Sequence, residues 1–169
     1  MFTEKQIEEI IDLLLDLDEN TKIYLGCDSV RFKKNGKRYA KFATVAVVHM
    51  NGKNGCRVFR HRSVEPDYDL KSNRPTMRLM NEAQKVSELY VQLAPLVDQF
   101  DIEIHLDINT DPIHGSNCAA SQAAGFVLGV TGVEPKLKPE SFAASFGADH
   151  YANRFGNITD SMYEDKKAS

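Results

Sequence analysis

The sequence has no tryptophan, only three cysteines and no long apolar run. The cysteines are odd in number and lack the paired spacing of zinc sites, which argues against a disulfide-bonded domain and a thiolate metal centre: Cys27, Cys56 and Cys118. No run approaches the roughly 18 apolar residues of a membrane span. The first ten residues, MFTEKQIEEI, are too acidic and polar for a signal peptide. We therefore expect a cytoplasmic protein.

Acidic residues are missing from one segment, although the net charge of the chain is −3. Residues 29–64 contain ten Lys or Arg and no Asp or Glu. A local positive field can attract phosphate groups even when the total charge is negative. The candidate nucleic-acid contacts flank the turn signal Asn35-Gly36: Lys33, Lys34, Lys37 and Arg38. The alternative is an exposed hairpin that these charges keep in solution.

A chain of 169 residues with 42% hydrophobic residues fits one domain over 1–169, with 1–20 as an N-terminal helical extension and 160–169 as a flexible tail. Hydrophobic periodicity and turn signals predict helices over 4–17, 75–94, 116–129 and 139–154, and strands over 22–30, 40–50, 56–64, 102–109 and 133–137. This order predicts an α/β fold with a mixed five-stranded sheet, three antiparallel strands followed by two parallel ones, flanked by helices.

The strand over 102–109, IEIHLDIN, alternates strictly between apolar and polar residues. Its polar face carries Asp107 near the carboxyl end, and Asp28 lies late in strand 22–30. If helix 75–94 is a crossover, the two strands are parallel neighbours and their carboxyl ends meet. Glu82 lies at the edge of the apolar stripe of that helix, and Asp149 shares a helical face with two phenylalanines.

Four acids from four elements would then converge on one point: Asp28, Glu82, Asp107 and Asp149. Clustered carboxylates resist ionising together unless a cation joins them. Mg²⁺ and Mn²⁺ prefer carboxylate oxygens, and a pair of such ions can catalyse phosphodiester hydrolysis. Three of the four acids also have a structural interpretation. Glu82 could pair with Lys85, Asp149 with Arg154, and Asp28 could shape a strand end.

Further polar residues near these acids are predicted to have supporting roles: Ser29, His105, Asn109, Ser116, Asn117 and His150. His105 alternates with Asp107, which raises the possibility of a metal ligand, but a hydrogen bond deeper in the sheet is the preferred interpretation. His150 could move a proton. Asn109, Ser116 and Asn117 are expected to shape the turn into the following helix, where a phosphate contact is also possible.

The element order and the acids resemble the ribonuclease-H-like fold, and more narrowly the YkuK-like family of predicted ribonuclease-H-like nucleases, a domain of unknown function. The resemblance is carried by LGCDSV (25–30), IHLDIN (104–109), SN (116–117), VEPKLKPESFAAS (133–145) and AD (148–149). It implies that Asp28 and Asp107 match the acids of the first and fourth strands. Glu82 would match the acid of the first helix of that fold, and Asp149 that of the last.

Three functions are therefore compared. The first is a metal-dependent nuclease that cuts RNA, an RNA–DNA hybrid or structured DNA with two Mg²⁺ or Mn²⁺ ions. The second is a non-catalytic nucleic-acid-binding module on the same scaffold, which needs no metal. The third is an accessory protein whose acidic N-terminal helix docks on a partner. A nucleotide-binding ATPase ranks last, because the sequence lacks paired glycine-rich phosphate loops.

Overall fold

A single mixed sheet organises the computed structural model, which describes residues 1–52, 55–71 and 73–143. The strand order is β3-β2-β1-β4-β5. The strands are β1 (Lys22–Lys34), β2 (Lys37–His49), β3 (Cys56–Pro66), β4 (Asp101–Asn109) and β5 (Lys136–Lys138). Strands β1 to β3 are antiparallel, whereas β4 is parallel to β1 and β5 is parallel to β4. The predicted mixed sheet is confirmed.

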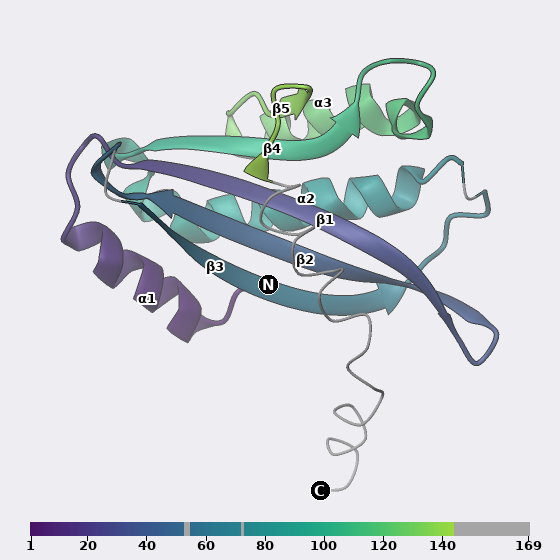
Figure 1. The fold of residues 1–169 in the computed structure, drawn as a ribbon, viewed down its shortest axis with the longest axis horizontal. Helices are drawn as coiled ribbons and strands as arrows, with labels where there is room; N and C mark the ends of the chain where they lie inside the picture. The colour runs from purple at the N-terminus through teal and green to yellow at the C-terminus, as the bar shows by residue number, and fades with distance from the viewer. Residues whose placement is uncertain (53–54, 72, 144–169) are drawn as a thin grey trace, which may run out of the picture.

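The helices are α1 (Glu4–Leu15), α2 (Thr76–Leu93) and α3 (Ala120–Thr131) within the described ranges. Short 3₁₀ turns follow or precede the main elements at Met50–Gly52, Ala94–Gln99 and Gly115–Ala119. Helix α1 begins with a capping box, in which Thr3 and Gln6 satisfy each other's backbone N–H groups. Figure 1 shows α2 running along the sheet beside β1 as the connection between β3 and β4.

One hydrophobic core lies between α2 and the sheet face that faces it. The alternating apolar residues of β1 and β4 meet the apolar stripe of α2 and the buried side of α1. Fully buried members include Ile10, Ile23, Leu25, Phe42, Val86, Leu89, Ile104 and Leu106. The remaining sheet face is therefore the one that carries the alternate residues of β1 and β4, Asp28 and Asp107 among them.

Several predicted boundaries are wrong. Helix α1 ends at Leu15, not at residue 17, and β1 and β2 extend through the basic stretch to the tight turn at Asn35 and Gly36, because pairing across the hairpin does not require apolar alternation. Strand β3 continues to Pro66, and the last strand covers 136–138, not 133–137. The helix predicted from residue 116 starts as a 3₁₀ turn and becomes α-helical only at Ala120.

The final predicted helix does not begin at Pro139. Residues 139–140 form a turn after a cis peptide bond between Lys138 and Pro139, and helical structure is first assigned at Ala143. The rest of that predicted helix, and the predicted tail over 160–169, lie outside the described residues.

Candidate functional site

Asp28 and Asp107 lie where β1 and β4 separate. The parallel pairing of these strands ends at Cys27 and Leu106, so Asp28 and Asp107 are the next residue in each strand. Side chains alternate along a strand, which puts both carboxylates on the sheet face opposite α2. In Figure 1, β1 and β4 diverge toward their carboxyl ends. The two acids therefore flank the opening of the sheet at the carboxyl ends of two parallel strands.

Each member of this pair has a contact within the protein. The Asp28 carboxylate accepts a hydrogen bond from the backbone N–H of Ser29 at 2.7 Å. The Asp107 carboxylate forms an ion pair with Lys138 of β5, and its side chain is 21% exposed. Lys138 is in register with Asn109, so β5 brings the ammonium group to the end of β4. The negative charge of Asp107 is thus compensated by Lys138, a pairing that the sequence pattern did not predict.

Glu82 lies on the α2 side of the sheet, where its side chain is only 2% exposed. It accepts a hydrogen bond from the Ser29 hydroxyl at 2.5 Å. Arg78, one turn earlier in α2, donates to Glu82 at 3.3 Å, to the Ser29 hydroxyl at 2.6 Å and to the Ser29 backbone carbonyl at 2.7 Å. Because Ser29 and Asp28 are consecutive, they point to opposite faces of β1. Glu82 therefore contacts Ser29, whereas Asp28 lies on the sheet face that carries Asp107.

Burial raises the pKa of Glu82 to about 8, and the negative charges of Asp28 and Asp107 act in the same direction. The hydrogen bond from Ser29 and the charge of Arg78 oppose this shift. Glu82 is thus mainly protonated at neutral pH. The charges of both aspartates therefore affect the ionisation of Glu82, although Glu82 lies on the other face of the sheet.

Arg78 was missed by sequence reasoning, although its spacing of four residues from Glu82 is a signal for a helical ion pair. The loop before α2 positions it. The Asp69 carboxylate accepts hydrogen bonds from the backbone N–H groups of Met77 and Arg78, at 2.8 and 3.0 Å, and so caps the first turn of α2. Arg31 of β1 ties down this loop by pairing with Asp67 and Asp69.

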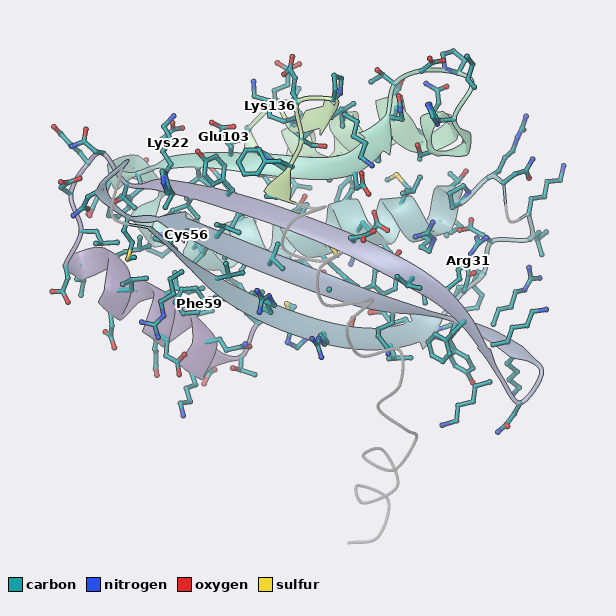
Figure 2. The ribbon with its side chains drawn as sticks, viewed as in Figure 1. Lys22, Arg31, Cys56, Phe59, Glu103 and Lys136 are labelled. Atoms are coloured by element: carbon teal, nitrogen blue, oxygen red, sulfur yellow. The ribbon has the colours of Figure 1, made fainter. Side chains whose placement is uncertain are left out.

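Figure 2 shows how these contacts are distributed along β1. Arg31 lies toward the end of the strand that approaches this loop, whereas Lys22 and Glu103 lie together where β1 and β4 begin. A close approach at Gly115 further fixes the two loops, because a side chain there would collide with the Asn73 carbonyl oxygen. The start of α2 and the turn after β4 are thereby packed against each other.

The candidate phosphate contacts divide into two kinds. Lys33, Lys34 and Lys37 are exposed near the tip of the β1–β2 hairpin, which extends beyond β3 and β4 in Figure 1. Arg38 instead donates hydrogen bonds to the backbone carbonyls of Asp69 and Leu70, at 3.1 and 3.3 Å. Arg38 is therefore exposed but also has structural contacts, and the three lysines add to the exposed positive charge of the tip.

The buried His105 ring connects β4 to the segment after β5. Its Nδ1 accepts hydrogen bonds from the backbone N–H groups of Phe142 and Ala143, both at 3.1 Å, and Nε2 lies 3.2 Å from Glu103. Burial lowers the pKa of His105. A neutral ring with its proton on Nε2 satisfies all these contacts, so His105 anchors the segment after β5 to β4.

The turn after β4 uses the other supporting residues for its own hydrogen bonds. Ser116 accepts from the backbone N–H of Asn109 at 3.1 Å, and Asn117 donates to the Thr110 carbonyl at 2.6 Å. The Asn109 side chain accepts from the backbone N–H of Asp111 at 2.9 Å. These contacts hold the turn beside Asp107. Asp149 and His150 lie outside the described residues.

A metal ion would find two carboxylates here within the described ranges. No group of three or more His, Cys, Asp or Glu side chains in them is arranged to hold one metal ion. Asp28 and Asp107, both oxygen ligands at one strand opening, nevertheless fit Mg²⁺, which is usually held by one or two carboxylates together with water and substrate phosphate. Asp28 and Asp107 are thus suited to bind a divalent cation together.

A five-stranded sheet of order β3-β2-β1-β4-β5, with acids at the separating ends of β1 and β4, defines a ribonuclease-H-like fold. The chain belongs to the Ribonuclease H-like family, whose model matches residues 5–153. Comparison with curated proteins and with solved structures gave no match. Among the described helices, none is long and apolar enough to cross a membrane.

Proposed function

We propose that the protein hydrolyses phosphodiester bonds in nucleic acid in a reaction that depends on Mg²⁺ or Mn²⁺. The observation that carries this proposal is the pair Asp28 and Asp107, which follow the last paired residues of β1 and β4 on one face of the sheet. Membership of the ribonuclease-H-like family supports a nuclease-like scaffold. The narrower assignment to the YkuK-like family and a cytoplasmic location belong to the same proposal.

Asp28 and Asp107 would hold the metal, and two bound ions would supply an activated water and stabilise the leaving oxygen. Glu82 would become a further ligand only by losing its proton and turning from Ser29 toward the two aspartates, and Asp149 is the fourth candidate ligand. Arg78 and Ser29 hold the Glu82 carboxyl on the α2 side of β1 through hydrogen bonds. The exposed lysines of the hairpin tip would contact backbone phosphates, which gives affinity that falls with salt and carries no sequence preference.

Cleavage of labelled RNA, RNA–DNA hybrid and branched DNA by the Asp28→Asn and Asp107→Asn variants tests the proposal. With Mg²⁺ or Mn²⁺ present, each variant should lose about 100-fold or more in rate, the usual effect of removing a preorganised electrostatic group. Asp101→Asn is a matched control, because Asp101 lies on the same strand and face as Asp107 but pairs with Lys22 at the opposite end. Its rate should stay at the parental value.

Equal cleavage by the parent and both variants would contradict the assignment of these acids. Binding of nucleic acid without any cleavage, and without affinity for Mn²⁺, would instead favour the non-catalytic binding module. Absence of binding to metal and to nucleic acid would favour the accessory protein that docks through its N-terminal helix.

A further inference from the structure

Two stacked aromatic rings lie on the sheet face that carries Asp28. Phe32 of β1 and Tyr39 of β2 are directly opposite each other, with ring centroids 5.6 Å apart and ring planes 24° from parallel. Both side chains are partly exposed. Phe32 follows Asp28 by four residues, so alternation puts both on the same face, about 13 Å apart along β1. Exposed rings beside a candidate reaction site need an explanation other than core packing.

The surface around the rings is apolar at its centre and cationic at its border. Lys41 lies with its ammonium nitrogen 6.0 Å from the Phe32 ring centroid. It is flanked by Val30 and Val64, its cross-strand partners, which are 45% and 38% exposed. No acidic residue occurs between positions 29 and 64. This aromatic platform, consisting of Phe32, Tyr39 and Lys41, is therefore complementary to a polyanion that also presents flat, stackable rings.

We propose that the aromatic platform stacks an unpaired base of a single-stranded nucleic acid, while the hairpin lysines contact its phosphates. The inference rests on the proposed function and specifies its substrate class. A base inside a duplex has its faces covered by neighbouring base pairs and cannot stack on a protein ring. A single strand exposes those faces, and stacking on them tolerates any base. The platform thus favours single-stranded RNA or DNA over a hybrid duplex.

Fluorescence anisotropy in EDTA measures this binding separately from cleavage. The probe is a labelled oligouridylate or oligothymidylate of about 12 nucleotides, compared with an abasic strand of equal length and charge. The double substitution Phe32→Ala and Tyr39→Ala should weaken binding of the pyrimidine strand about 5- to 150-fold, the loss expected for stacking contacts, and leave the abasic strand unchanged. The uridylate and thymidylate arms distinguish RNA from DNA.

Two control variants keep the result interpretable. Phe32→Tyr retains an aromatic face and should retain affinity, which separates loss of stacking from loss of folding. Lys34→Ala with Lys37→Ala should weaken both strands alike and reduce the dependence of affinity on salt, because it removes phosphate contacts and keeps both aromatic rings. Circular dichroism of each variant confirms that the sheet has formed.

Equal affinity of the parent for the pyrimidine and abasic strands would overturn the proposal. An equal loss of affinity for both strands in the aromatic double variant would also overturn it. So would displacement of the oligonucleotide by polyglutamate from the parent but not from the double variant, which would indicate an acidic protein partner. Ring-dependent binding without cleavage by the parent would overturn only the proposed nuclease. Cleavage with ring-independent binding would overturn only the aromatic platform.

Discussion

Asp28 and Ser29 are consecutive residues, yet they lead to two different chemical environments. On the α2 side, Ser29, Arg78 and Glu82 form a closed hydrogen-bonded cluster from which water is nearly excluded. On the other side, Asp28 and Asp107 flank an opening of the sheet, where Asp107 is partly exposed. The comparison shows that burial against α2 favours the protonated form of one carboxyl group, whereas two others lie where the strands separate.

Among the predicted changes in stability, the largest should come from replacing the buried Glu82. The folded-state pKa of Glu82, about 8, lies above its ordinary value of 4.5, so the native state binds more protons than the unfolded state between these values. The contribution of Glu82 to stability is complete below about pH 4.5 and is lost as the pH rises toward 8. Glu82→Gln lacks this titration and should exceed the parent at pH 9 by roughly a few kcal/mol.

Urea unfolding at pH 5, 7 and 9 measures this difference. Glu88→Gln is the matched control, because Glu88 is a partly exposed acid of the same helix. Its stability should follow that of the parent at each pH. A constant difference between Glu82→Gln and the parent from pH 5 to pH 9 would show that Glu82 titrates normally.

The next largest change in stability should come from removing Arg78, the cation of the closed cluster. Arg78→Ala removes the donor to Ser29 and Glu82 and should lower the free energy of unfolding by about 1.5–3 kcal/mol, as expected for hydrogen bonds to a charged group. Arg74→Ala removes an exposed arginine just before α2 and should change it by less than about 0.5 kcal/mol. Equal losses in thermal or urea unfolding would contradict the cluster.

The smallest change in stability is expected for a substitution beside Asp107, on the sheet face opposite α2. Lys138→Ala removes a partly exposed ion pair with Asp107, which contributes less than about 1 kcal/mol. The same change removes a competing cation and should increase the affinity for Mn²⁺, measured by calorimetric titration. Lys136→Ala is the control, because Lys136 pairs with the exposed Glu140, and it should leave Mn²⁺ binding unchanged. Weaker Mn²⁺ binding by Lys138→Ala would exclude Asp107 as a ligand.

Much of the fold follows from local patterns. The alternation in IEIHLDIN and the long amphipathic helix before it predict a parallel strand beside β1, and the register brings Asp107 next to Asp28. The turn at Asn35-Gly36 predicts the hairpin. The length of that hairpin could not be predicted, because its basic residues do not alternate with apolar ones and only cross-strand hydrogen bonds define where the strands end.

The candidate site is less accessible to sequence reasoning. The alternation of β1 puts Asp28 and Ser29 on opposite faces, but which face α2 covers depends on the packing of the whole sheet. That packing directs Glu82 to Ser29 and makes Arg78 its partner. Likewise, the pairing of Lys138 with Asp107 depends on the register of β5, a strand of three residues with little pattern of its own.

The two backbone hydrogen bonds accepted by His105 Nδ1 have a consequence for mutational scanning. No other side chain presents a neutral aromatic nitrogen that can accept from two successive amides while its second nitrogen donates to Glu103. A saturation screen would therefore score His105, two residues from Asp107, as intolerant of every substitution. Such intolerance would suggest a catalytic role for His105. Its cause would instead be structural, because the ring joins β4 to the chain beyond β5 through hydrogen bonds.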